Sequence, residues 1–319
     1  MKNKVLYLFI IILCATRSVA QDVNFSTIGQ LPLLLNPSQA GNFDSDNRLS
    51  VAFRNVAFSS SYAFSSGVVS LEHRFKKGID ENDRLAIGFS GVFDQSNNGA
   101  LKSNYAGIAI AYAKALDPQG KSRLSAGLQG VWVSRRLDVN KLVFADQFTS
   151  GGFATNLPSA DAFRSGAIGY FDVNAGVGYQ LKQERFGLDL GVALFHGSSP
   201  REQFWGEGYK LPRRYTVHGK SYHNVNADDR IYVQVVANFQ DAAKEQLIGA
   251  YFSKDLGNEG VKYKLNVGSY YRTESAVVPY LGLESAKWKA AVTYDVNISG
   301  LKDARSNMRA MEMNIQYGF

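Results

Sequence analysis

The feature that most constrains the fold is a period-two alternation of apolar and polar residues that recurs along the chain. It is clearest in the last nine residues, where apolar side chains occupy every second position from Met311 to Phe319. Successive side chains of a β-strand point to opposite faces, so this stretch predicts a strand with one apolar face. It fits either an edge strand of a soluble sandwich or a strand of a membrane barrel.

Fourteen such runs follow one another, an even number, as in single-chain bacterial outer-membrane barrels. Most contain the roughly nine to eleven residues that a tilted strand needs to cross a bilayer. The less apolar face of several runs mixes Gly, Ala, Ser and Asn with an occasional charge, which suits a crowded lumen better than open water. The sequence predicts an all-β, transmembrane, antiparallel up-and-down β-barrel of about 14 strands. The runs are 48–56, 62–75, 84–94, 104–115, 123–135, 168–181, 185–195, 213–222, 230–239, 246–254, 262–272, 277–284, 287–296 and 308–319.

The connections between these runs support the same fold. The long connections are 136–167, 196–212 and 297–307. Counted from the start of the chain, they are the fifth, seventh and thirteenth, so all three are odd-numbered. The short connections at 182–184 and 285–286 are the sixth and twelfth, so both are even-numbered. Outer-membrane barrels have long external loops and short periplasmic turns, so we expect a chain that starts in the periplasm. The polypeptide should then require detergent to remain in solution.

The beginning of the chain is predicted to be a cleaved signal peptide, residues 1–20. Lys2 and Lys4 precede an apolar run of eleven residues, Val5–Ala15, which is too short to span a bilayer. The single cysteine, Cys14, lies within it. We therefore expect no disulfide, zinc-thiolate site or cysteine nucleophile in the mature protein.

The remaining chain divides into a segment at 21–47, which is periplasmic or tucked into the lumen, and the barrel itself at 48–319. Loss of the leader lowers the formal charge from +7 to +4, without any block of like charges. A nucleic-acid partner is therefore not indicated. No later segment contains the roughly 18 apolar residues of a membrane helix, so only a closed barrel could span a membrane.

Several short blocks along the chain share their order and spacing with one family of bacterial proteins. Leu35-Asn36-Pro37 with Ala40-Gly41 resembles the family's opening block, and Phe53-Arg54-Asn55 its tyrosine-arginine-asparagine. The strand block is Leu124–Gln129 and the loop block is Leu142–Gln147. The later blocks are Lys210–Tyr215 with His218-Gly219, Tyr271-Arg272, Val292–Asp295 and Ser299–Leu301. In this order and spacing, the blocks resemble the PorP/SprF outer-membrane proteins of the type IX secretion and gliding-motility system.

The resemblance implies a non-enzymatic outer-membrane accessory barrel that supports secretion or surface attachment of a partner cargo protein with a type IX sorting domain. Its implied partners are outer-membrane lipid, that cargo, and periplasmic and outer-membrane components of the machine. Candidate contacts are Asn36, Pro37 and Gly41 before the barrel and Asp146, Gln147, Lys210, Leu211 and Pro212 in or beside the long loops. Loop packing is the alternative role for the latter five residues.

Charged residues on strands are candidates for a polar network in the lumen. We assign Arg54, Arg272 and Asp295 to this network, since fourteen strands enclose a narrower lumen than open porins have. Tyr317 and Phe319 resemble the signal that closes outer-membrane barrels and directs their insertion, and we interpret them as the assembly signal.

Catalytic, metal and cofactor sites are not indicated. His218 and His223 are five residues apart, which on a strand directs them to opposite faces. His196-Gly197-Ser198-Ser199 at an outer rim leaves an envelope enzyme of the phospholipase type as one alternative function. A channel for solutes or fatty acids is the other alternative.

Overall fold

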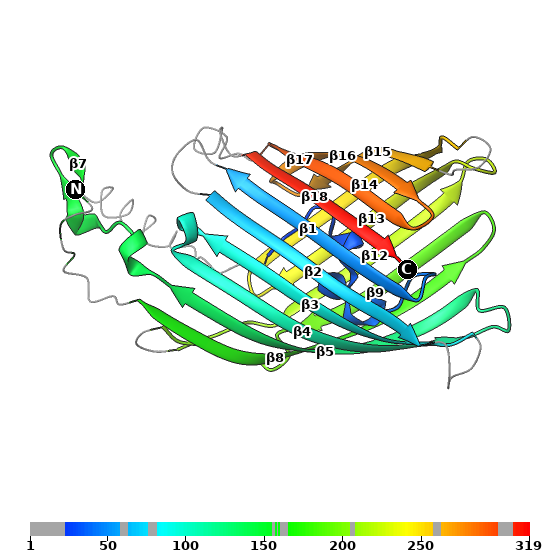
Figure 1. Cartoon of the computed structure of the whole chain (residues 1–319), viewed down its shortest axis with the longest axis horizontal. Coiled ribbons are helices and arrows are strands. Elements are labelled where there is room, and N and C mark those ends of the chain that lie inside the picture. The colour runs from blue at the N-terminus through cyan, green and yellow to red at the C-terminus, as the bar shows by residue number, and fades with distance from the viewer. Residues whose placement is uncertain are drawn as a thin grey trace, which may run out of the picture.

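The structure, a computed structural model, describes residues 23–57, 63–75, 82–154, 157, 159, 165–204, 208–257, 263–298 and 309–319. Within these residues, fourteen antiparallel strands form one closed barrel (Figure 1). Each strand pairs with its neighbours in chain order, and β18 pairs with β1 to complete the ring. The strands are β1 (Asn47–Ala57), β2 (Ala63–Phe75), β3 (Arg84–Ser96), β4 (Leu101–Ala115), β5 (Ser122–Leu137), β8 (Gly166–Lys182), β9 (Phe186–Phe195), β12 (Arg214–Asn224), β13 (Arg230–Gln240), β14 (Ala243–Asp255), β15 (Tyr263–Arg272), β16 (Ala276–Ser285), β17 (Trp288–Asn297) and β18 (Arg309–Gly318).

The predicted fold class and strand count are confirmed. Each of the fourteen alternating runs became one strand, and the ends differ by no more than three residues. The largest differences are at the starts of β4 and β14. In β4 the ladder continues to the pair Leu101–Leu137, beyond the region of clear alternation, because main-chain pairing does not depend on side-chain polarity.

The outer face of the barrel is apolar, as the alternation predicted. On β18, Met311, Met313 and Ile315 are 51%, 50% and 56% exposed, whereas the alternate residues Glu312 and Asn314 are buried in the lumen. The same division recurs along the other strands. Apolar side chains exposed in a continuous belt are stable only in contact with lipid.

The two ends of the barrel differ in the length of their connections. The long-loop end carries the connection from β5 to β8, whose described residues include η4 (Val139–Lys141), η5 (Ala145–Gln147) and hairpin β6–β7 (Phe148–Thr149, Gly152–Phe153). It also carries residues 196–213 with hairpin β10–β11 (Arg201–Glu202, Tyr209–Lys210), and η3 (Asn97–Gly99). The short-turn end has connections such as 183–185 and 286–287. In Figure 1, β5 and β8 extend beyond the other strands, and β7 stands clear of the barrel.

A short helical segment fills the lumen ahead of β1. It comprises η1 (Ile28–Gln30), α2 (Pro32–Leu35) and η2 (Pro37–Gln39), and in Figure 1 it lies in blue behind β1 and β2. None of the helices among the described residues is long and apolar enough to cross a membrane. Most of the third predicted long connection, 297–307, lies outside the described residues, as does the predicted signal peptide.

Candidate functional site

Residues 23–46, which we call the plug, occupy the barrel interior and form the candidate functional site. Local sequence explains their compact course. Pro32 opens α2 and Pro37 opens η2, positions where the missing N–H of proline costs nothing. Asn36 lies between them, and its side-chain oxygen accepts a hydrogen bond from the Ser38 N–H at 2.9 Å, capping η2.

The plug buries its apolar residues against the lumen wall in three clusters. Leu35 packs among wall residues of β13 to β17, and Leu33 packs against alanines of β3 and β4. Phe25 and Leu31 pack against β1, β2 and β3. Leu31, Leu33 and Phe25 are at most 1% exposed. Burial of each such side chain contributes about 1.5–3 kcal/mol, so the plug is part of the core.

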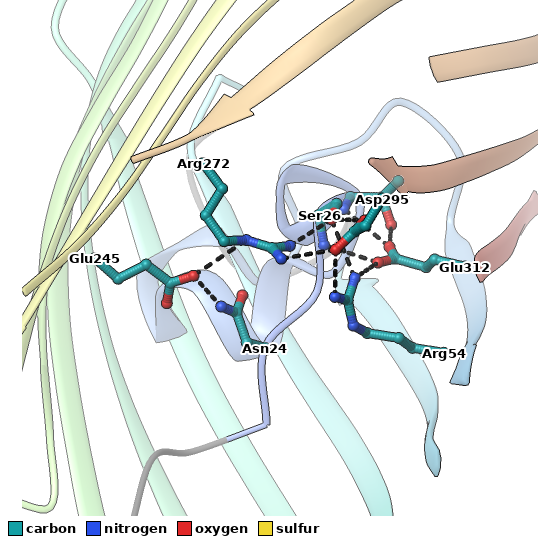
Figure 2. A network of polar contacts seen from close by, with 8 residues as sticks. Asn24, Ser26, Arg54, Glu245, Arg272, Asp295 and Glu312 are labelled. Carbon is teal, nitrogen blue, oxygen red and sulfur yellow. Dashed lines mark hydrogen bonds and ion pairs between the residues drawn. The ribbon is translucent and has the colours of Figure 1, made fainter. Parts of the chain in front are cut away.

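Three charges predicted to share the lumen are in contact (Figure 2). The guanidinium groups of Arg54 on β1 and Arg272 on β15 both contact Asp295 on β17, at 2.6 and 2.8 Å. Arg54 also contacts Glu312 on β18 at 3.3 Å. The polar face of the alternation in β18 pointed to Glu312, but the sequence did not indicate its partner.

The plug is bonded directly to this network. The Ser26 hydroxyl accepts hydrogen bonds from Arg54 at 3.1 Å and Arg272 at 2.5 Å. Glu312 accepts the main-chain N–H groups of Ser26 and Thr27 at 2.7 and 2.9 Å, and also the Thr27 hydroxyl. Hydrogen bonds to a charged group contribute about 1.5–3 kcal/mol each, so these bonds anchor the plug to the strands that close the barrel.

Further polar side chains extend this anchor toward β14. Arg272 lies 3.3 Å from Glu245, which accepts a hydrogen bond from the plug residue Asn24 (Figure 2). A second anchor lies on the neighbouring strands β1 and β2, where Arg48 pairs with the fully buried Glu72 at 2.8 Å. Glu72 also accepts the N–H of Gly41 at 3.2 Å. The two anchors together involve six of the fourteen strands, namely β1, β2, β14, β15, β17 and β18.

Asn36 attaches the plug to the wall at β8 and β9. Its amide nitrogen lies 3.0 Å from the Val177 oxygen, 3.3 Å from the Val192 oxygen and 3.0 Å from His218 Nε2. Glycines make room for this approach. A Cβ on Gly176 would lie 1.9 Å from the Asn36 side-chain oxygen, so no other residue fits there without displacing the plug.

Pro37 and Gly41 are buried in the same region. A Cβ on Gly127 would lie 2.5 Å from Pro37 main-chain atoms. Gly41 has φ of +75°, a conformation that favours glycine. The candidate contacts Asn36, Pro37 and Gly41 thus lie within the lumen and contact the barrel wall.

The plug separates two cavities. The loop-side cavity, about 150 Å³, lies toward the long-loop end and is lined by Phe25, Leu34, Phe195, Arg214 and other residues. The vestibule, about 600 Å³, reaches the short-turn end. Gln30 and Asn42 of the plug line its floor.

The candidate loop residues differ in exposure. Asp146 is exposed, and its carboxylate accepts the Ser159 hydroxyl at 2.9 and 3.0 Å. Gln147 is buried: its side chain accepts the Phe144 N–H at 3.0 Å and donates to the Leu157 oxygen at 2.6 Å. Gln147 therefore braces the loop.

In the second loop, Lys210 is exposed on β11 and Leu211 is 4% exposed. The Leu211 N–H donates to the Pro200 oxygen at 2.9 Å, and the Pro212 oxygen accepts from Gln240 of β13 at 3.3 Å. Leu211 and Pro212 thus fasten the loop to the barrel rim, and only Lys210 of the three is displayed.

His196 and Ser198 both hydrogen-bond to Asp172, at 2.6 and 2.7 Å. The Ser198 hydroxyl proton is directed to the carboxylate, whereas a nucleophilic serine would direct it to an imidazole. No group of three His, Cys, Asp or Glu side chains in the described part of the chain is arranged to hold a metal ion.

Tyr317 and Phe319 lie on the outer face beside the junction of β18 and β1. Their rings stack with centroids 5.7 Å apart. The main chain of Phe319 exchanges hydrogen bonds with Asn47 at 2.8 and 3.1 Å. These residues therefore contribute to the closure of the ring.

A closed antiparallel barrel with an apolar outer belt and a polar lumen is the architecture of a bacterial outer-membrane β-barrel protein. The chain belongs to the family of type IX secretion system membrane proteins PorP/SprF, whose model matches residues 18–317. The resemblance read from the sequence blocks is thereby confirmed, and so is the outer-membrane location. The family and the fold are those of membrane proteins of secretion and transport.

Solved structures share the fold at low identity. The toluene transporter TbuX of Ralstonia pickettii is 11% identical, with a TM-score of 0.53 over 92% of this chain and 94% of that chain. The toluene transporter TodX of Pseudomonas putida is 11% identical, with a TM-score of 0.51 over 90% and 92%. A comparison with curated protein sequences found no significant match.

Proposed function

We propose that this barrel is a non-enzymatic accessory component of the type IX secretion system. It supports secretion or surface attachment of a partner cargo protein that carries a type IX sorting domain, of the gliding or adhesin kind, and it links to periplasmic components of the machine. The observation that carries this proposal is the plugged lumen. A barrel whose interior is filled by its own chain, through Arg54, Glu312 and their partners, serves better as a docking platform than as an open pore.

The long-loop end offers a surface for cargo. Outer-membrane barrels direct their long loops outward, so residues 138–165 face the exterior in this orientation. Val143 and Phe148 in this loop are 41% and 64% exposed, outside the strands that cross the membrane. Large apolar side chains exposed to water favour a protein contact. Asp146 lies between them and Gln147 braces the loop from within.

The proposal is tested in a strain from which the gene has been deleted. We expect surface levels of one partner cargo to fall while the envelope stays intact, as measured by protease accessibility on whole cells. Complementation with the wild-type gene should restore the surface level of the cargo. A variant with both Val143→Ser and Phe148→Ser should restore less than half of the wild-type surface level. Lys141→Ser, an exposed residue of the same loop, is the matched control. Normal surface levels of every type IX substrate in the deletion strain would rule the proposal out.

A channel for small apolar solutes is the second candidate function. It is favoured by the loop-side cavity, whose apolar lining includes Phe25, Leu34 and Phe195, and by the fold shared with toluene transporters. The plug would have to move for a solute to cross. Solute-dependent conductance of the purified barrel in planar bilayers is expected under this alternative, and its absence argues against it.

A further inference from the structure

The vestibule contains a row of four tyrosines that the proposed function does not use. Tyr222 on β12, Tyr232 on β13 and Tyr251 on β14 stand directly opposite one another in the ladders. Tyr280 on β16 follows across Gly268 of β15. Successive ring centroids are 5.8, 4.7 and 5.1 Å apart. The absence of a side chain on Gly268 lets the last two rings meet across the intervening strand.

Two cations lie against this row without an acidic partner. The Lys220 ammonium lies 5.2 Å from the Tyr232 ring centroid and 5.9 Å from that of Tyr251. The Arg230 guanidinium lies 4.9 Å from the Tyr222 ring centroid. An ion pair requires a distance of 4.0 Å or less between the nitrogen and the carboxylate oxygen. Among the described residues, no carboxylate oxygen lies this close to the Lys220 ammonium or the Arg230 guanidinium.

The carboxylates near Lys220 are engaged elsewhere. Asp189 stands directly opposite Lys220 in the β9–β12 ladder, but it accepts hydrogen bonds from Gln39 at 2.9 Å and Asn42 at 2.8 Å of the plug. Glu284 is paired with Lys289 at 2.8 Å. The Lys220 ammonium therefore lies in the lining of the vestibule without a carboxylate at ion-pair distance.

The vestibule as a whole is cationic. The negative side chains in its lining are outnumbered two to one, and a cavity with low-dielectric walls focuses the resulting positive potential. The basic lining residues are Arg48, Lys182, Lys220, Arg230, Lys287 and Lys289, and the acidic ones are Asp44, Asp189 and Glu284.

The positions of the two cations indicate how a ligand would lie in the vestibule. Arg230 begins β13 at the short-turn end, whereas Lys220 stands opposite Gln234, four residues farther in. At about 3.3 Å per residue, the two positions are roughly 13 Å apart along the main chain. Their charged groups contact neighbouring rings of the tyrosine row, those of Tyr232 and Tyr222, so an acidic peptide segment that lies along this row can reach both. The tyrosine rings would pack against its aliphatic stems.

We propose that the vestibule is a socket for an acidic peptide segment of a periplasmic partner protein, recognised by Lys220 and Arg230. The plug closes the inner end of the socket, so the site suits a tethered segment rather than a transported solute. The inference deepens the proposed function and rests on it for the periplasmic orientation of the short-turn end. It assigns to that end a partner of defined chemistry, independent of the cargo at the other end.

The test uses the full-length barrel in detergent micelles and a fluorescein-labelled decaglutamate peptide, with binding followed by fluorescence anisotropy at low salt. Lys220→Gln and Arg230→Gln are each expected to weaken binding at least tenfold, whereas Lys220→Arg should retain most of it. Lys244→Gln, in the lining of the loop-side cavity, is the control and should bind like wild type. Empty micelles give the background. Heat-modifiable migration in gels verifies that each variant is folded.

Equal binding by wild type and the folded Lys220→Gln variant would overturn the inference. So would equal binding of labelled decaglutamine, because recognition would then not depend on charge. A further competition experiment displaces the labelled peptide with inorganic phosphate or with unlabelled decaglutamate at equal total charge. If phosphate competes equally well, the vestibule is a simple anion site and the peptide socket is excluded. Cargo display in the deletion strain tests the proposed function separately, since it does not depend on peptide binding in micelles.

Discussion

The carboxylate of Glu312 accepts the main-chain N–H of Ser26 at 2.7 Å, across 286 residues of sequence. The plug and the strand that closes the barrel are thus joined at a point where both are fully buried. We expect Glu312→Gln to keep the barrel folded but to loosen the plug. An amide is a weaker acceptor than a carboxylate, and the change should cost about 2 kcal/mol, or roughly a 30-fold larger open population.

The measurement for Glu312→Gln is protease access to the plug in folded, detergent-solubilised barrel. Glu284→Gln is the control, because its carboxylate pairs with Lys289 of the neighbouring strand and not with the plug. Identical cleavage rates for Glu312→Gln and wild type would show that this bond does not hold the plug.

Gly176→Ala should displace the plug from the wall, since its Cβ would lie 1.9 Å from the Asn36 side-chain oxygen. Overpacking of this kind costs about 1–3 kcal/mol, measured as a lower midpoint of thermal unfolding in micelles. Gly67→Ala is the matched control, because the nearest atom to its Cβ would be 4.0 Å away. Asn36→Ala combined with Gly176→Ala should cost less than the sum of the single changes. If the losses of stability from the two single changes simply added in the double variant, the contact between Asn36 and the wall at Gly176 would be contradicted.

Deletion of Phe319 should prevent assembly, because its main chain exchanges hydrogen bonds with Asn47 where the ring closes. Phe319→Leu keeps those bonds and an apolar side chain, and should assemble. The measurement is heat-modifiable migration of the outer-membrane fraction. A truncated chain that is still heat-modifiable in the outer membrane would be inconsistent with Phe319 as part of the assembly signal.

Asp229 in the turn between β12 and β13 should stabilise the barrel in a pH-dependent manner. Hydrogen bonds from the Asn226 and Lys254 side chains and the Asp255 N–H lower the pKa of Asp229 to about 2. Because the folded-state pKa lies below the unfolded value near 3.9, the stabilisation is complete above about pH 5 and is lost as the pH falls through about 2.

The measurement is the unfolding temperature of wild type and Asp229→Asn in micelles between pH 6 and pH 2. The difference between the two proteins should be constant above about pH 5 and vanish near pH 2. Asp228→Asn, at an exposed neighbouring position, controls for loss of charge in the turn. A wild-type advantage that persists unchanged at pH 2 would refute the assignment.

The barrel could be predicted from sequence because each strand carries its own alternation, independent of its neighbours. Arg54, Arg272 and Asp295 were identifiable because charges interrupt the expected pattern of lumen-facing small residues. Neither Glu312 nor Glu245 was identified as a partner: Glu312 lies on the polar face of a predicted strand, whereas Glu245 lies one residue before the predicted run 246–254. Their pairing depends on how fourteen strands close around the plug, and this information is not contained in any single segment.

The plug itself was only partly predictable. Residues 21–47 lack alternation, and Pro37 and Gly41 indicated turns, but a periplasmic and a lumenal position were equally compatible with them. The distinction is made by Gly127 and Gly176 on distant strands, which leave the space that Pro37 and Asn36 occupy. The exposed loop residues could not be sorted by sequence either, since Asp146 and Gln147 are adjacent but only the first is displayed.

The contact between the plug and β18 also sets an order of events during biogenesis. At a synthesis rate of about 5–20 residues per second, Ser26 leaves the ribosome roughly 15 to 60 s before Glu312 exists. A chain that has not been completed cannot form the contact between Ser26 and Glu312, however many of its earlier strands have paired. A chain that ends before β18 therefore lacks this anchor of the plug.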